Sequence, residues 1–275
     1  METIIFDGRA FAAEKEDELK KGLAKLNNKG ITPKLVSVLV GNDPASILYV
    51  NLKKKVGERI GVKVEILRFD DNVCVDELIH RHKELSIDES VDGIMLQLPL
   101  PEKFTLDDRD EIINSITKEK DVDGLRSDSP FLTPTVKSVL YVLQKASQNI
   151  VRLPLRVPPC KVVVVGYSGF EGGKIYKVLK EMSYEVTGID SKTKDLKKKT
   201  QSADILISAT GSPGIIQGNM IKEGAVVIDV GAPKGDVVKD EVIGKAGFLS
   251  PVPGGVGPVT IISLFENMLD NCQAS

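Results

Sequence analysis

The stretch VVVVGYSGFEGGKI at residues 162–175 decides the fold of the C-terminal half. Val162 to Val165 is a short, β-branched apolar run of the kind that forms buried parallel strands. Gly166 opens a turn, a helical pattern runs from Ile175 to Met182, and a second β-rich run follows at Glu185 to Ile189. A strand, a helix and a second strand in this order predict a βαβ unit and, with it, a Rossmann-type doubly wound parallel sheet.

The turn after the first strand is a variant of the dinucleotide-binding pattern GxGxxG. Ser168 stands where the second glycine is usual, and Gly172 comes one residue later than the last glycine. Because the turn follows a strand and opens a helix, its amides and the helix dipole are suited to a pyrophosphate. A flexible turn without a ligand is the alternative interpretation.

Asp190 ends the second strand, at the position where a carboxylate accepts hydrogen bonds from the ribose hydroxyls of NAD. The same charge repels the 2′-phosphate of NADP, and Tyr167 supplies no guanidinium to neutralise that phosphate. Lys192 and Lys194 would restore NADP binding if one of them folded back. The sequence therefore predicts NAD as the cofactor, with NADP possible and a plain turn residue as the alternative for Asp190.

The rest of the chain alternates in the same way. In the N-terminal half, helices are predicted at 9–28, 43–60, 75–85, 106–116 and 136–146, and strands at 35–40, 62–69 and 93–97. Further strands at 205–209 and 225–230 each end in glycine, and Thr260 to Asn271 has the pattern of an amphipathic helix. Arg152 to Pro159 holds three prolines and is a candidate linker between two α/β domains.

Composition limits the classes of function. At 275 residues the chain is longer than one typical domain, and its net charge of -2 gives no field that favours nucleic acid or an anionic membrane. No run approaches the roughly 20 apolar residues of a membrane span, and no signal peptide opens the chain, so we expect a cytoplasmic protein with a small-molecule partner. Cys74, Cys160 and Cys272 lack the spacing of metal ligands, so we expect no metal and reduced thiols.

Four polar side chains are candidates for chemistry on a substrate. Tyr49 and Lys53 are spaced i, i+4 on one face of a predicted helix, although Lys53 in a run of three lysines could equally be a surface residue. Gln97 ends an apolar strand and presents an amide at its edge. Asp123 lies in a tight turn before Gly124, where turn chemistry explains it and Asp121 equally well.

Five motifs, in this order, resemble one family along nearly the whole chain. They are DPAS at 43–46 followed by Tyr49 and Lys53, QLPLP at 97–101, KDVDG at 120–124, ATGSP at 209–213 and PVPGGVGP at 251–258. The chain is similar in these motifs to the methylenetetrahydrofolate dehydrogenase/methenyltetrahydrofolate cyclohydrolase family.

The resemblance implies a folate-binding catalytic domain formed by residues 1–134 plus 258–275, a Rossmann dinucleotide-binding domain at 135–257, and a folate cleft between them. It implies oxidation of 5,10-methylenetetrahydrofolate followed by hydrolysis to 10-formyltetrahydrofolate, with a homodimer formed through the cofactor domain. Lys53 and Gln97 would serve the hydrolysis, Tyr49 would stack near the one-carbon centre, and Asp123 would bind the pterin.

The resemblance also implies the residues that line the two sites. Those expected at the substrate are Tyr49, Gln97, Leu98, Pro99, Asp123, Pro253, Gly254, Gly255 and Pro258. Those expected at the cofactor are Gly166, Tyr167, Ser168, Gly172, Asp190, Ser191, Ala209, Thr210, Gly211, Val230, Gly231, Gly257 and Thr260.

The sequence departs from the family at the cofactor turn. Tyr167 and the pair Asp190-Ser191 replace an arginine and a His-Ser pair that NADP-using members typically have, and Lys174 replaces a proline. The loop from Asp123 to Pro134 is also shorter than usual. Two other classes of function remain open at this point: a different two-domain nicotinamide dehydrogenase, of shikimate or malic type, and a non-catalytic nucleotide-binding regulator.

Overall fold

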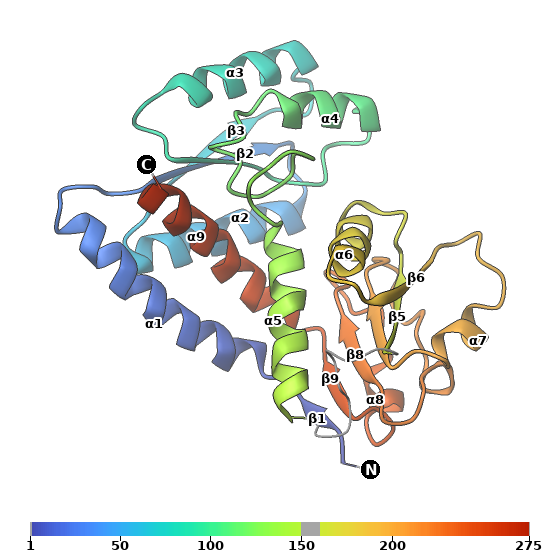
Figure 1. Ribbon diagram of the computed structural model, residues 1–275. Helices are drawn as coiled ribbons and strands as arrows, with labels where there is room; N and C mark the ends of the chain where they lie inside the picture. Colours follow the sequence, from blue (N-terminus) through green and yellow to red (C-terminus); the bar gives the residue numbers. More distant parts are fainter. Residues whose placement is uncertain (1, 150–159, 275) are drawn as a thin grey trace. The chain divides into compact units, whose positions relative to one another are not determined.

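The computed structural model describes residues 2–149 and 160–274, so the predicted linker at Arg152 to Pro159 lies outside the described residues. The chain forms two compact units. One contains residues 1–12 and 135–260, and the other contains residues 13–134 and 261–275. Each unit has its own parallel sheet (Figure 1).

The first unit is built on a six-stranded sheet in the order β1-β9-β8-β7-β5-β6, in which every pair is parallel. Its strands are β1 Ile4–Ile5, β5 Lys161–Val165, β6 Glu185–Ile189, β7 Ile205–Ser208, β8 Val226–Asp229 and β9 Phe248–Ser250. Its helices are α5 Pro134–Asn149, α6 Phe170–Glu181, α7 Leu196–Thr200 and α8 Lys239–Val242, with a 3-10 turn at Gly218–Met220. The predicted doubly wound sheet is confirmed.

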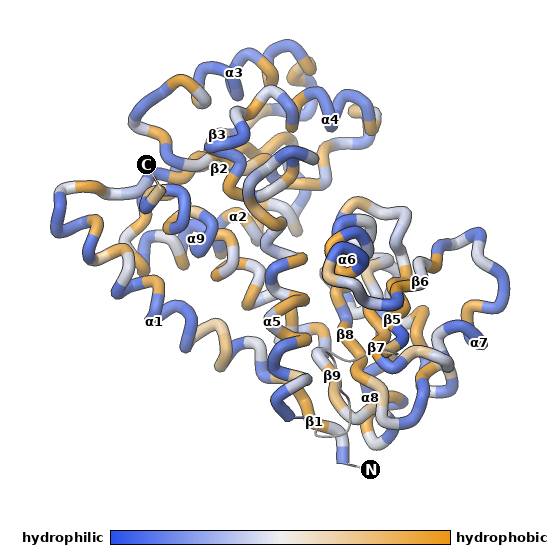
Figure 2. Tube along the Cα trace, viewed as in Figure 1, coloured by the Kyte–Doolittle hydropathy of each residue, from blue (hydrophilic) through white to orange (hydrophobic). Residues whose placement is uncertain are grey.

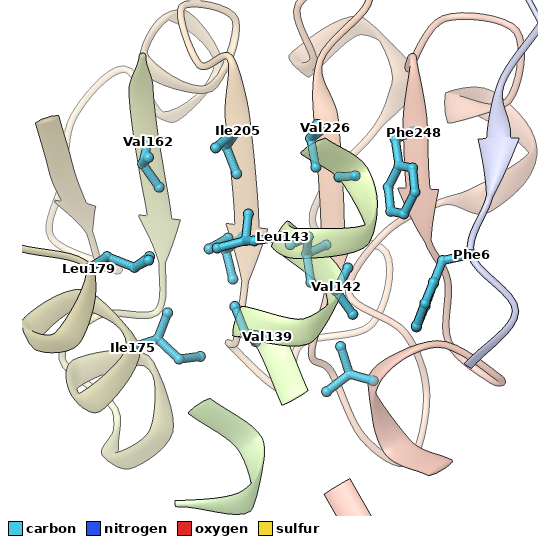
Figure 3. Close-up of a cluster of buried hydrophobic side chains, with 14 of the residues drawn as sticks. Phe6, Val139, Val142, Leu143, Val162, Ile175, Leu179, Ile205, Val226 and Phe248 are labelled. Atoms are coloured by element: carbon cyan, nitrogen blue, oxygen red, sulfur yellow. The ribbon is translucent and has the colours of Figure 1, made fainter. Parts of the chain in front are cut away.

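Hydrophobic side chains cover both faces of this sheet, because buried parallel strands point apolar residues in both directions. Figure 3 shows Val139, Val142 and Leu143 of α5 facing side chains of the central strands on one side. Leu206 and Val227 point to the other side and belong to a separate cluster. Figure 2 shows the same strands as mostly hydrophobic.

The second unit is built on a three-stranded parallel sheet in the order β3-β2-β4. Its strands are β2 Lys34–Val40, β3 Lys63–Phe69 and β4 Gly93–Leu96. Its helices are α1 Gly8–Asn27, α2 Pro44–Ile60, α3 Val75–Ile87, α4 Leu106–Asn114 and α9 Val256–Ala274, the first and last of which begin in the other unit. In Figure 1, α3 and α4 lie on one side of the sheet and α2 and α9 on the other, so this unit has three layers.

Close packing of α2 and α9 depends on a glycine. A β-carbon on Gly57 of α2 would collide with Val64 of β3 and lie 2.8 Å from the ring of Phe265 on α9. Because interiors pack at crystal-like density, this small residue lets the helix approach both neighbours.

Three local features differ from the sequence prediction. Helix α6 begins at Phe170, five residues before the predicted start, because the glycines after it pack into its first turn. The last helix begins at Val256 instead of Thr260. The first twelve residues, which the predicted division assigns to the N-terminal domain, belong to the unit of the larger sheet because Ile4 pairs with Phe248. Within the described ranges, no helix is long and apolar enough to cross a membrane.

Candidate functional site

Polar and glycine-rich turns follow four neighbouring strands of the larger sheet at the same edge. The amide of Gly166 donates to the carbonyl of Ile189 at 2.7 Å, that of Ala209 to Val165 at 2.9 Å, and that of Val230 to Ser208 at 2.8 Å. The strands therefore end in register, and the residues predicted to bind the cofactor after β5, β6, β7 and β8 lie along one edge. Ligands of open parallel sheets bind at this carboxyl edge.

The turn between β5 and α6 has the close packing that a phosphate-binding turn needs. Gly166 has φ +87°, and a β-carbon there would lie 2.5 Å from the carbonyl oxygen of Ala209. Gly172 packs directly on the carbonyl oxygen of Gly166, so neither position accepts a side chain. Ser168 and Gly169 are exposed at the start of the 12-residue helix α6, where the helix dipole favours an anion. The turn fits a pyrophosphate even without the full glycine pattern.

Asp190 follows β6 directly and is held in one orientation. Its Oδ1 accepts a hydrogen bond of 3.0 Å from the amide of Lys192 and one of 2.8 Å from the hydroxyl of Thr193. The Thr193 hydroxyl, followed by the Lys192 amide and ammonium charge, lowers the pKa of this carboxyl. Asp190 is therefore ionised at neutral pH, beside the exposed Ser191.

Two buried carboxyl groups, which the sequence reasoning missed, organise the turns after β7 and β8. Asp229 ends β8 and accepts hydrogen bonds from the amides of Gly231, Asp236 and Val237 at 2.9–3.0 Å. Asp236 accepts bonds from the Ser208 hydroxyl at 2.8 Å and the Thr210 amide at 2.7 Å.

Asp236 thus ties the ATGSP turn after β7 to the loop after β8, and burial raises the pKa of the Asp229 carboxyl. The only sequence signal was an aspartate at the end of an apolar strand. That signal does not show which backbone amides the carboxylate contacts.

The PVPGGVGP segment links β9 to α9 in the unit of the larger sheet. The amide of Gly8 donates to the carbonyl of Gly254 at 2.8 Å, and that of Gly255 to Pro251 at 2.8 Å. A β-carbon on Gly255 would lie 2.5 Å from the carbonyl oxygen of Pro251. Pro253 precedes this contact, and the last members of the predicted set, Gly257, Pro258 and Thr260, lie in the first turns of α9. This arrangement fixes the loop against the start of α1.

In the second unit, the structure brings Lys53 and Gln97 together. Lys53 extends from α2, and its Nζ donates to the side-chain oxygen of Gln97 at 3.1 Å and to the sulfur of Met95 at 3.1 Å. The Gln97 amide nitrogen in turn donates to the carbonyl of Leu98 at 2.6 Å, which fixes the orientation of the amide. Lys53 is half-buried here, so its ammonium is held at the end of β4 and does not extend freely into water like Lys55.

Tyr49 lies one turn before Lys53 on α2 and is also half-buried. The helix starts at Asp43, whose carboxylate accepts a bond of 2.7 Å from the amide of Ser46, so the DPAS motif fixes the start of the helix that carries both side chains. Leu98 is half-buried and Pro99 exposed just after Gln97. The motif DPAS therefore has a structural role here, and Tyr49 and Lys53 stay the predicted site residues of this helix.

The turn KDVDG separates its two aspartates. Asp121 is buried and accepts bonds from the amides of Leu125 at 3.1 Å and Arg126 at 2.9 Å. Burial, partly opposed by these amides, raises its pKa to about 6. Asp123 is half-buried, and Gly124 after it has φ +63° with no room for a β-carbon. Asp121 therefore fixes the turn, and Asp123, the less buried of the two aspartates, stays the predicted ligand contact.

No cluster of three or more His, Cys, Asp or Glu side chains suited to a metal ion occurs among residues 2–149 and 160–274. The structure thus assembles two groups of predicted residues. One group surrounds the carboxyl edge of the larger sheet, and the other contains Tyr49, Lys53, Gln97 and Asp123 in the second unit.

Comparisons with known proteins cover both groups. The family model described as the tetrahydrofolate dehydrogenase/cyclohydrolase catalytic domain matches residues 6–123, and that of the NAD(P)-binding domain of the same family matches residues 134–275. A relative from Halalkalibacterium halodurans, named bifunctional protein FolD, is 39% identical over 98% of both chains.

Two solved structures are similar to this chain over almost its whole length. The crystal structure of the bifunctional FolD enzyme from Campylobacter jejuni is 34% identical, covers 99% of each chain and superimposes with a TM-score of 0.89. The Trypanosoma brucei enzyme, solved with NADP and an inhibitor, is 30% identical over 100% of this chain and 98% of its own, with a TM-score of 0.90. Two family models, a relative matched over 98% of its own length and these structures point to the same family, and the chain belongs to the FolD family of bifunctional methylenetetrahydrofolate dehydrogenases/cyclohydrolases.

Proposed function

We propose that this enzyme oxidises 5,10-methylenetetrahydrofolate with NAD in preference to NADP and hydrolyses the methenyl product to 10-formyltetrahydrofolate. Cofactor binding is assigned to the unit of the larger sheet, and the folate chemistry to the unit that holds Tyr49, Lys53, Gln97 and Asp123. When bound, NAD accepts a hydride from the methylene carbon, and the folate becomes a delocalised methenyl cation. Positioning and electrostatics are sufficient for that step, so it requires no protein base.

The observation that carries the cofactor preference is the fixed, ionised carboxylate of Asp190 at the end of β6. One of its oxygens is engaged by Lys192 and Thr193, which sets the plane of the carboxylate for a ribose diol. A 2′-phosphate there would bring two negative groups together, and Tyr167 offers no positive charge. The positive charge of Lys192 lowers the pKa of Asp190, so Lys192 is the residue best placed to lessen this repulsion.

The test is the rate of methenyltetrahydrofolate formation with NAD and, separately, with NADP. The wild-type enzyme should have the larger kcat/KM with NAD. Asp190→Ser should lower the ratio of the two kcat/KM values at least about 10-fold, because it removes both the ribose acceptor and the repulsion. Lys192→Ala should raise the ratio. An enzyme that prefers NADP, or an Asp190→Ser variant with an unchanged ratio, would contradict the assignment, and a protein without turnover on either cofactor would instead be a nucleotide-binding regulator.

The cyclohydrolase step consumes water. Water adds to the methenyl carbon, one ring C–N bond breaks, the ring nitrogen takes a proton, and one proton is released to solvent. Lys53 is proposed to move the proton, since its Nζ is held within hydrogen-bond distance of Gln97 and each end of the Gln97 amide has a partner. Asp123 is proposed to accept hydrogen bonds from the pterin, and Tyr49 to stack beside the reacting carbon.

Lys53→Met tests this role, because methionine keeps an unbranched side chain only one atom shorter and has no ionisable group. Cyclohydrolase turnover should fall at least about 100-fold, the lower end of what a general acid–base contributes. Dehydrogenase turnover should remain measurable, since no base is needed there. Lys55→Met, an exposed residue two positions later on the same helix, is the matched control and should keep both activities. Normal cyclohydrolase turnover in Lys53→Met would refute the role of the lysine.

The family resemblance also leads us to propose a homodimer formed through the cofactor-binding unit. Sedimentation equilibrium of the purified enzyme should give twice the chain mass of 29.9 kDa. A mass of one chain across the micromolar range would rule the dimer out.

A further inference from the structure

The side chain of Tyr167 lies on strand β6 at a position where only glycine leaves room for it. A β-carbon built on Gly188 would lie 2.5 Å from Cγ of Tyr167 and 2.7 and 2.8 Å from the two adjacent ring carbons. Real β-carbons do not approach other atoms so closely, so any side chain at 188 would force the ring to move. The ring of Tyr167 therefore takes the place of a side chain on β6.

A second aromatic ring and two backbone hydrogen bonds also hold Tyr167 in place. Its centroid lies 5.4 Å from that of Tyr176 on α6, with the ring planes tilted by 50°, a favourable arrangement for an aromatic pair. The amides of Gly166 and Tyr167 both donate to the carbonyl of Ile189, at 2.7 and 3.3 Å. The turn that would receive the pyrophosphate is therefore fixed to the end of β6 through both the backbone and this side chain.

Gly188 lies two residues before Asp190. Alternate residues of a strand face the same side of the sheet and are about 6.6–7 Å apart along it. Asp190 directly follows β6, so the same alternation assigns its side chain to the face of the sheet on which the ring of Tyr167 lies over Gly188. The ring is 36% exposed, so part of it remains accessible to a ligand that reaches Asp190.

We infer that Gly188 is a specificity-determining residue. Because it leaves space on β6, the ring of Tyr167 lies beside Asp190. A ribose with a free 2′-hydroxyl would then have the carboxylate on one side and the phenol ring on the other. This inference rests on the proposed preference for NAD and explains how the turn residue and the strand residue act together. The ring carries no positive charge to offset the repulsion between Asp190 and a 2′-phosphate.

A double-mutant cycle tests the coupling. Gly188→Ala should displace the ring and raise KM for NAD at least about 5-fold with a smaller change in kcat, because a coupling of about 1 kcal/mol or more is typical of residues in contact. In a Tyr167→Ala background, where no ring is present to collide, the same substitution should change KM less than about 2-fold. Thr187→Val, at the exposed neighbouring position that faces the other side of β6, is the matched control and should leave KM for NAD unchanged.

Far-UV circular dichroism and the urea midpoint report whether each variant is folded. An equal effect of Gly188→Ala in both backgrounds, or no effect in either, would overturn the inference. This outcome differs from failure of the proposed function: an enzyme that prefers NADP would refute the preference for NAD, whereas an NAD-preferring enzyme without coupling between 188 and 167 would refute only the role of Gly188.

Discussion

Replacing His82 with glutamine should remove a large acid sensitivity of folding. His82 lies on α3 with no exposed surface. Burial, which outweighs the opposing effect of the Leu78 carbonyl, lowers the pKa of its imidazole from 6.5 to about 4. The imidazole therefore binds a proton near pH 6.5 in the unfolded chain but only near pH 4 in the folded chain. The stability that is present above pH 6.5 is consequently lost as the pH falls towards 4.

The magnitude follows from that difference. At about 1.36 kcal/mol per pKa unit, the two pKa values correspond to a ceiling of about 3.4 kcal/mol, of which about 3 kcal/mol is reached by pH 4. The free energy of unfolding of the wild type minus that of His82→Gln should therefore fall by about 3 kcal/mol between pH 7 and pH 4. Comparing the two proteins cancels the contribution of carboxyl groups that both contain.

Urea denaturation followed by circular dichroism at several pH values measures this difference. His80, the only other histidine of the chain, provides the matched control, because its side chain is 76% exposed on the same helix. Because the chain has two histidines, the two variants together assign the imidazole proton resonances. A wild-type minus His82→Gln difference that stays constant with pH, or a His82 resonance that titrates near pH 6.5, would refute the reasoning.

Three further perturbations test the structure. Burial raises the pKa of Asp121 to about 6, so its stabilising effect is complete below the unfolded value of 3.8 and is lost as the pH rises through 6. The stability of the wild type minus that of Asp121→Asn should therefore fall by about 2.4 kcal/mol from pH 4 to pH 7, opposite in sign to His82, and a constant difference would contradict the pKa. Gly57→Val should lower the free energy of unfolding by about 3 kcal/mol, since the added methyl groups collide with β3 and α9; an unchanged urea midpoint would show that the helices are not packed this closely. Iodoacetamide at pH 8 should modify Cys74 first, because Cys74 is exposed, whereas burial raises the pKa of Cys160 to about 11 and that of Cys272 to about 12. Fast labelling that survives Cys74→Ser would contradict this order.

The elements that sequence predicts well are those whose pattern is local. Strands β5, β7 and β8 are continuous apolar runs that end in glycine or a polar turn, and the structure has them within a residue of the predicted bounds. β1 contains only Ile4 and Ile5, and a two-residue strand is too short to carry an alternating pattern. Its position comes from pairing with β9, more than 240 residues away.

The start of α6 shows a second limit. Gly172 and Gly173 have low helix propensity, so the sequence favours a turn there. The structure makes them helical because Gly172 must pack on the carbonyl of Gly166, and close approach outweighs propensity. The predicted site residues were found through motifs, whereas the 3.1 Å contact of Lys53 with Gln97 joins residues 44 apart and is set by helix and strand packing. The contacts of Asp236 with two neighbouring strand ends are equally non-local, which is why no pattern predicted them.

Helix α9 has a consequence for the order in which the newly made chain can fold. Residues 261–275 belong to the unit that starts at residue 13, and three of its glycines, Gly22, Gly57 and Gly93, face Leu269, Phe265 and Met268 of α9. Because synthesis proceeds from the N-terminus, the small sheet leaves the ribosome before strands β5 to β9 but lacks these packing partners until α9 has been made. The unit of the small sheet is thus completed only after those strands, and its apolar helix faces are open to chaperones while they are being synthesised.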